Sequence, residues 1–157
     1  VGRVLAKELG WDFVDTDNQI EEVTGLKIPE LFRKYGEVRF RSEESLAVSK
    51  LKNARHTVIA TGGGTVLDPQ NRAALEELGV IIHLYAPLEV VLKRVKRRRE
   101  RPLLDKSDSE IAKLWQERLD CYNRARLTID TSTRNIEEIA QEILAIVKGG
   151  IRHETAN

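Results

Sequence analysis

The sequence predicts an α/β fold in which helices cover a parallel sheet. Short runs of β-branched and aromatic residues alternate along the chain with longer segments whose apolar residues recur every three or four positions. Residues that cap helices stand at the ends of several of these longer segments. Because a helix after each strand carries the chain back to the starting edge of the sheet, this alternation favours parallel pairing.

The first half of the chain predicts two strands and the helices around them. An amphipathic helix over Val1–Leu9 should stop at Gly10, since glycine accommodates the left-handed turn that ends many helices. The elements expected next are a strand over 11–14, a polar helical region over 16–35 that breaks at Gly25 and restarts near Pro29, a long helix from 36 to about 53, and a strand over 57–61.

The second half continues the alternation. Asp68 should cap a helix that has Pro69 at its first position and runs to Gly79. The strand over 80–85 is apolar enough to be covered on both faces. The remaining expected elements are a helix after Pro87, a helix from the capping box at Ser107 to about 124, a strand over 127–130 and a closing helix capped by Asn135. We expect one domain over 1–150 and a frayed tail over 151–157.

Composition limits the classes of function. With 157 residues and a formal net charge of +1, the chain has the length of one domain and lacks the strong positive charge typical of proteins that bind nucleic acid or anionic membranes. Its single cysteine, Cys121, excludes an internal disulfide, and no apolar run approaches the ~18 residues of a membrane span. We therefore expect a cytoplasmic protein that binds neither nucleic acid nor membranes.

The stretch from His56 to Val66 carries the strongest functional signal. A β-branched segment runs directly into the glycines Gly62–Gly64, and a backbone without side chains lets its N–H groups approach a small ligand closely. A flexible turn is the alternative. Parallel α/β sheets bind ligands at the carboxyl ends of their strands. The other candidates are carboxylates that follow another strand and arginines elsewhere in the chain, namely Asp15, Asp17, Arg41, Arg101 and Arg118. Together these groups suit a small polyhydroxy acid that meets a phosphate donor.

A series of short motifs resembles the signatures of shikimate kinases, which belong to the P-loop kinases. In order they are FVDTD, GEVRFRSEE, ATGGGTV, RERPLL, ERLDCYNRA and DTSTRN, and the similarity runs from Val1 to about Gly150. The resemblance implies a three-layer P-loop kinase fold, with a parallel sheet in the strand order 2-3-1-4-5. It also implies that the helices over about 16–53 bind the substrate.

One element of that family does not occur in the sequence. Shikimate kinases begin with a strand and a phosphate-binding loop of the type GxxGxGKS/T, and these 157 residues contain no GxxxxGK[ST]. The backbone cradle for phosphate, the phosphate lysine and the hydroxyl that holds Mg²⁺ belong to that loop, and strand 1 precedes it. We expect that the sequence is truncated and that these residues alone do not turn over ATP.

The resemblance implies roles on the substrate side. Asp17 would orient the attacking hydroxyl and accept its proton, although it also stands where a helix cap is expected. Arg41 and Arg118 would grip the substrate carboxylate, because guanidinium forks match a carboxylate with two hydrogen bonds. For both arginines a surface ion pair is the alternative, with Glu44 as the partner of Arg41. The glycines Gly62–Gly64 would offer backbone N–H groups, foremost the middle one.

The resemblance also implies roles on the nucleotide side. Arg94 and Arg134 would flank the adenine of ATP. Asp15 matches the family's acidic group near Mg²⁺, which it would hold directly or through water, whereas a solvated loop carboxylate is the alternative.

The basic run Lys93–Arg101 has two other interpretations besides the family's. A solvated helix face explains most such runs, and nucleic-acid binding is disfavoured because no aromatic residue interrupts the basic ones. In the family this region is a lid, here over about 96–108. Arg101 would close onto the transferring phosphoryl group and neutralise its charge.

The function implied is ATP-dependent phosphorylation of shikimate to shikimate 3-phosphate, with Mg²⁺, in chorismate and aromatic amino acid biosynthesis. Shikimate and ATP are the expected partners, and the protein is expected to be a monomer. Two alternatives stay open at this point: another small P-loop kinase of the gluconate kinase type, and a relative that binds ligand without turnover.

Overall fold

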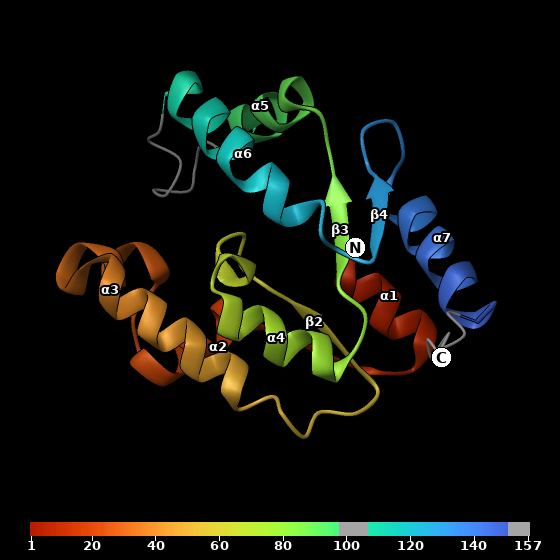
Figure 1. The fold of residues 1–157 in the computed structure, drawn as a ribbon, viewed down its shortest axis with the longest axis horizontal. Coiled ribbons are helices and arrows are strands. Elements are labelled where there is room, and N and C mark those ends of the chain that lie inside the picture. Colours follow the sequence, from red (N-terminus) through yellow and green to blue (C-terminus); the bar gives the residue numbers. More distant parts are fainter. Residues whose placement is uncertain (98–106, 151–157) are drawn as a thin grey trace.

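The computed structural model describes residues 1–97 and 107–150. Helices and strands alternate along the chain as the sequence predicts (Figure 1). The elements are α1 (Gly2–Leu9), β1 (Asp12–Asp15), α2 (Thr16–Thr24), α3 (Ile28–Ser49), β2 (Thr57–Ala60), the 3₁₀ turn η1 (Thr65–Leu67), α4 (Pro69–Leu78), β3 (Ile82–Tyr85), α5 (Leu88–Arg97), α6 (Asp108–Tyr122), β4 (Leu127–Asp130) and α7 (Ile136–Lys148).

The strands form two parallel pairs. β1 pairs with β2, with Asp15 opposite Ala60, and β3 pairs with β4, with Ile82 opposite Leu127. Within the described residues no ladder joins β2 to β3. The expected order 2-3-1-4-5 accounts for this division, because its central strand, number 1, has no counterpart among these residues and would separate the two pairs.

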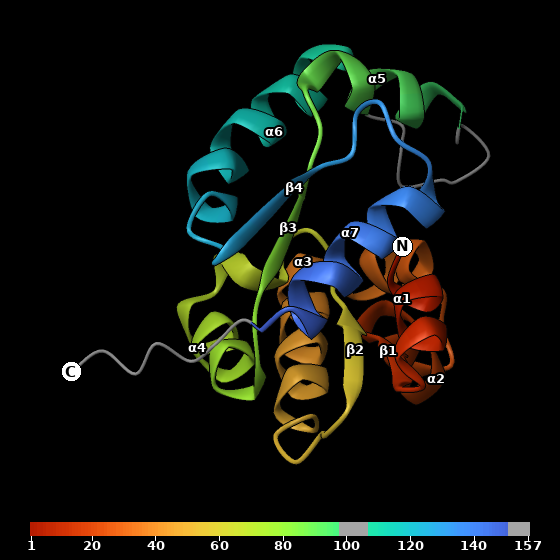
Figure 2. The same cartoon turned by 90° about the vertical axis from the view of Figure 1, so that its right-hand side faces the viewer.

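An apolar core holds the two pairs of strands together without that ladder. α1 and α7 lie side by side, and their buried residues pack with Ile129 of β4 and with partly buried residues of β2 and β3 (Figure 1). α6 lies on the other side of β3 and β4 from α7, which makes three layers (Figure 2). The expected three-layer architecture is therefore confirmed.

A second apolar core lies between α2 and α3. Ile20, Leu31 and Phe40 are buried there. α3 bends at Gly36, whose φ of 80° and ψ of 178° are not helical, so the helix expected from residue 36 joins the one before it across a kink. Arg41, which follows this bend, lies against Gly64 in the loop of glycines Gly62–Gly64.

Most of the expected elements are confirmed within a few residues. Gly10 ends α1 in the left-handed conformation, Asp68 caps α4, Ser107 forms the expected capping box, and Asn135 caps α7 as expected. The cap at Asn135 is also a capping box, which the sequence analysis does not predict. The prediction that β3 is covered on both faces is wrong. Leu84 is 43% exposed, because within the described residues β3 pairs only with β4 and its other edge, between the two pairs of strands, lacks a neighbouring strand.

Two expected segments lie wholly or largely outside the described residues. These are the tail over 151–157 and the lid over 96–108, of which only the end of α5 and the start of α6 are described. Among the helices of the described ranges, none has the length and apolarity that crossing a membrane requires.

Candidate active site

The loop Gly62–Gly64 leaves the carboxyl end of β2, directly beside the carboxyl end of β1. The two strands are in parallel register, so the end of β1 at Asp15 lies opposite the end of β2 at Ala60. The start of α2 and the glycine loop therefore meet at one edge of the strands. This is the position at which parallel sheets bind ligands.

Asp15, and not Asp17, caps helix α2. The Asp15 Oδ1 accepts hydrogen bonds from the backbone N–H groups of Asp17 and Asn18, at 2.9 and 3.3 Å. The interpretation of Asp17 as a cap is therefore wrong, because the cap lies two residues earlier. Asp17 Oδ1 is buried and has no hydrogen-bond partner among the described residues. Its carboxylate is thus free to bind a ligand.

The surroundings of Asp17 favour its protonated form. Burial raises the pKa of this carboxyl above its ordinary value, and the negative charges of Asp15, Glu44 and Glu21 raise it further, while Arg41 opposes them. A carboxyl whose pKa is raised holds a proton more readily than an ordinary one. This property suits a group that takes a proton from a reacting hydroxyl.

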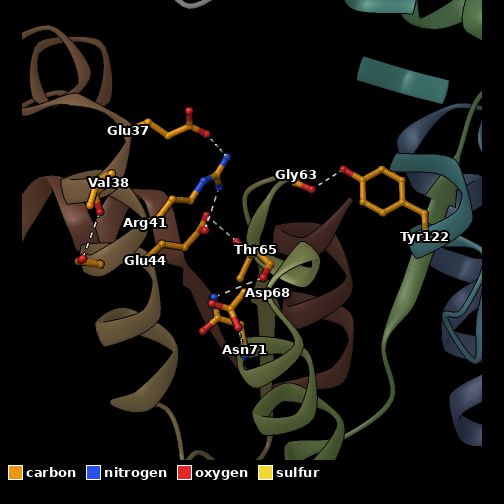
Figure 3. A network of polar contacts seen from close by, with 10 residues as sticks. Glu37, Val38, Arg41, Glu44, Gly63, Thr65, Asp68, Asn71 and Tyr122 are labelled. Atoms are coloured by element: carbon orange, nitrogen blue, oxygen red, sulfur yellow. Dashed lines mark hydrogen bonds and ion pairs between the residues drawn. The ribbon is translucent and has the colours of Figure 1, made fainter. Parts of the chain in front are cut away.

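Arg41 reaches the glycine loop from α3. Its Nη1 donates to Glu44 Oε1 at 2.9 Å, and its Nη2 lies 3.5 Å from Glu37 Oε1 (Figure 3). A Cβ on Gly64 would lie 2.6 Å from Arg41 Nη2 and 2.8 Å from its Cζ. The expected pair with Glu44 exists, but it is not a surface pair, because the Glu44 side chain is only 2% exposed.

The Glu44 carboxylate joins Arg41 to the glycine loop. Its second oxygen, Oε2, accepts a buried hydrogen bond of 2.8 Å from Thr65 Oγ1, directly after the glycines (Figure 3). The Thr65 carbonyl in turn accepts from Asn71 Nδ2 of α4 at 3.3 Å. Each oxygen of the buried carboxylate thus has a partner, as burial of a charge requires.

Arg118 and Tyr122 reach the same loop from α6. A Cβ on Gly63 would lie 2.7 Å from Arg118 Nη1 and 3.0 Å from the Tyr122 hydroxyl oxygen. The Tyr122 hydroxyl donates a hydrogen bond to the Gly63 carbonyl (Figure 3). Arg118 Nε is buried without a hydrogen-bond partner in the described part of the chain, so a bound anion could use this guanidinium.

A Cβ at Gly62 would meet the acidic side of the site. It would lie 3.1 Å from Asp17 Oδ1 and 3.4 Å from Glu44 Oε2. All three glycines are therefore closely surrounded by polar side chains. The structure brings together Asp17, Arg41, Arg118 and the glycine loop, although α6 is distant in sequence from α2 and α3.

The arginines expected near ATP lie beyond the carboxyl end of β4. Arg94 of α5 donates to the hydroxyl and the carbonyl of Thr131, at 2.9 and 2.6 Å. Arg134 pairs with Glu142 and donates to the Asp130 carbonyl at 2.6 Å. The expected lid residue Arg101 lies outside the described residues. In residues 1–97 and 107–150, no group of three or more His, Cys, Asp or Glu side chains is arranged to hold a metal ion.

Glu44 was expected only as a surface partner of Arg41, and neither Thr65 nor Tyr122 was expected in the site. Tyr122 follows Arg118 by four residues, the spacing that places two side chains on one helix face, so it could have been found. For Thr65 no such signal exists, because its partner Glu44 lies on a different helix.

The chain closely resembles proteins of known family. The profile of the shikimate kinase family matches residues 1–148. The chain is 43% identical to the shikimate kinases of Geobacter sulfurreducens and Pelotomaculum thermopropionicum, over 94% of its length and 83% and 87% of theirs. A structure of shikimate kinase from Acinetobacter baumannii in complex with shikimate superimposes with a TM-score of 0.87 at 37% identity, covering 94% of this chain and 84% of that one. The chain belongs to the shikimate kinase family.

Membership of this family confirms the resemblance expected from the motifs. The structure of shikimate kinase from Aquifex aeolicus agrees, with a TM-score of 0.82 at 33% identity over 94% of this chain and 88% of that one. These findings favour the family interpretation over the alternative of a gluconate kinase type.

Gly64→Ala should lower the free energy of unfolding by about 1–3 kcal/mol, because the added Cβ would push Arg41 away from the buried Glu44 carboxylate. Backbone strain is not the cause, since Gly64 has φ −91° and ψ −9°. Urea unfolding measures the effect. Gly79→Ala is the control, because no atom lies within 4 Å of its added Cβ. In an Arg41→Ala background the cost of Gly64→Ala should shrink, and an undiminished cost would contradict this explanation.

Asp17→Asn should stabilise the protein at pH 7. Because the folded state raises the pKa of Asp17, the proton binds the folded state more tightly, and the stability from this group is lost as the pH rises through the raised pKa. The advantage of the Asp17→Asn variant over the wild type should therefore shrink as the pH falls toward about 4. Urea unfolding between pH 4 and 7 checks this, with Asp120→Asn on the exposed face of α6 as the control. A loss of stability at pH 7 would contradict the prediction.

Proposed function

We propose that this protein transfers the γ-phosphoryl group of ATP to a hydroxyl of shikimate, which yields shikimate 3-phosphate and ADP. Membership of the shikimate kinase family supports the reaction. The single observation that carries the substrate assignment is that Arg41 and Arg118, from two different helices, both lie against the glycine loop. Shikimate has one carboxylate, and two converging guanidinium groups are suited to bind it.

The substrate side of the proposed site consists of three kinds of group. Arg41 and Arg118 bind the ring carboxylate, and Gly62–Gly64 offer N–H groups to the substrate. Glu44 keeps Arg41 in place, because its buried carboxylate accepts one hydrogen bond from Arg41 and another from the glycine loop. A guanidinium held at one edge keeps its other N–H groups available for a ligand.

Asp17 is the proposed general base. The hydroxyl oxygen of shikimate forms a bond to the γ-phosphorus, the bond from that phosphorus to the bridging oxygen of ADP breaks, and the hydroxyl proton passes to Asp17. The position of Asp17 at the start of α2, with a free buried oxygen, supports this role. Positioning and charge neutralisation supply the rest of the catalysis.

The nucleotide side is proposed from residues at the other pair of strands. Arg94 and Arg134, held by Thr131 and Glu142, would flank the adenine, and Arg101 would contact the transferring phosphoryl group. Asp15 has one oxygen engaged in the helix cap, so its other oxygen could hold Mg²⁺ through a water molecule. Such an ion would neutralise charge on the phosphates. Because one chain supplies all these groups, we propose that the protein acts as a monomer.

Arg41→Lys should raise the Kd of shikimate about 10- to 100-fold, because lysine keeps the charge but loses the two-pronged hydrogen bonding. The affinity for ATP should change much less. Arg41 lies against the loop that follows β2, whereas the proposed nucleotide side lies at the pair β3 and β4. Isothermal titration of each ligand separately measures the two affinities.

Arg39→Lys is the matched control for this variant. Arg39 lies on the same helix but pairs with Glu43 at 3.0 Å on an exposed face, so its replacement should leave shikimate binding unchanged. Titration with gluconate tests ligand choice, and the wild-type chain should bind it far more weakly than shikimate. An equal loss of affinity for shikimate and ATP in Arg41→Lys would remove Arg41 from the substrate site.

A further inference from the structure

Tyr122 contacts the glycine loop and has no role in the function proposed so far. It lies on α6 one turn after Arg118, and its hydroxyl donates to the Gly63 carbonyl (Figure 3). Burial raises the pKa of this hydroxyl, although the charge of Arg118 opposes the shift, so it stays a protonated donor at neutral pH. Its ring centroid lies 5.0 Å from that of His83 on β3, so the ring also packs against this strand.

The hydrogen bond from Tyr122 has a consequence on the opposite side of the loop. The peptide bond between Gly63 and Gly64 is trans and planar, so its C=O and N–H point in opposite directions. With the Gly63 carbonyl turned toward α6, the Gly64 N–H faces away from α6, on the side where Arg41 lies (Figure 3). Arg41 is one of the two arginines that are proposed to bind the substrate carboxylate, so this N–H points to that part of the proposed site.

We propose that Tyr122 is a substrate-positioning residue, which holds the Gly63 carbonyl and so aims the Gly64 N–H group at the carboxylated substrate. This inference rests on the proposed function. Glycine has more backbone freedom than any other residue, so a loop of three glycines would otherwise have to be ordered by the ligand at the expense of affinity. The hydrogen bond orders the peptide before the substrate arrives.

Cys121, the residue before Tyr122, makes it possible to distinguish a positioning role of Tyr122 from a role in holding α6 in place. Cys121 Sγ donates to the Val66 carbonyl at 3.2 Å, and Arg72 Nη1 donates to the Cys121 carbonyl at 2.9 Å. Cys121 therefore fastens α6 to the segment after the glycines, without touching Gly63. Loss of the Cys121 contact should affect stability alone, whereas loss of the Tyr122 hydroxyl should affect shikimate binding as well.

The test compares shikimate binding by the wild-type chain, Tyr122→Phe and Cys121→Ala, with calorimetric titration and urea unfolding of each. Phenylalanine keeps the ring against His83 and removes only the donor. Tyr122→Phe should raise the Kd of shikimate about 3- to 10-fold, the range expected for one hydrogen bond, and leave the Kd of ATP within about 2-fold. Cys121→Ala should leave both within about 2-fold.

The outcomes distinguish this inference from the proposed function. If the wild-type chain fails to bind shikimate, the proposed function fails. If it binds, and Tyr122→Phe binds equally well, Tyr122 is not a positioning residue. If both variants lose shikimate affinity in proportion to their loss of stability, the role is structural only and the inference is overturned.

A second measurement observes the peptide directly. In a chain labelled with ¹⁵N-glycine, only the 10 glycines give amide signals, and Tyr122→Phe should shift that of Gly64 before any ligand is added. An unchanged Gly64 signal would contradict the inference even if the affinity fell.

Discussion

The buried carboxylate of Glu44 is the constraint on which the rest of the site depends. An unpaired charge in a protein interior is very costly, so each of its oxygens needs a donor. Arg41 supplies one donor from the same helix, and Thr65 supplies the other from the end of the glycine loop. One buried charge therefore fixes an arginine and a loop relative to each other, although they are distant in sequence.

This arrangement explains why the loop consists of glycines. The loop must pass between Asp17, Arg41 and Glu44 on the α2–α3 side and Arg118 on the α6 side. A Cβ at Gly63 or Gly64 would enter space that guanidinium atoms occupy, and a Cβ at Gly62 would lie only 3.1 Å from Asp17 Oδ1. Backbone strain does not demand glycine at Gly64, whose φ and ψ are those of a right-handed turn. Close approach is the physical reason, and the same closeness lets backbone N–H groups reach a ligand.

The site also collects like charges at a cost to stability. Asp15, Asp17 and Glu44 lie near one another, and their mutual repulsion together with burial raises the pKa of Asp17. Such a concentration of acidic groups is unfavourable in a folded protein and is typical of functional sites. Arg41 offsets part of this repulsion, so the same guanidinium that is proposed to bind substrate also stabilises the charged form of Asp17.

The sequence by itself determined the local structure and the candidate residues of the site. Apolar periodicity, capping residues and Gly10 were enough to place the helices, because these signals act within a few residues along the chain. The ordered motifs were enough to indicate the family, and they named Asp17, Arg41 and Arg118 as candidates.

Only the tertiary structure decided which groups meet. Asp15 replaced Asp17 as the helix cap, Glu44 proved to be a buried link instead of a surface partner, and Tyr122 was found on the Gly63 carbonyl. Contacts between separate helices depend on packing across the strands, and no spacing in the sequence encodes that distance.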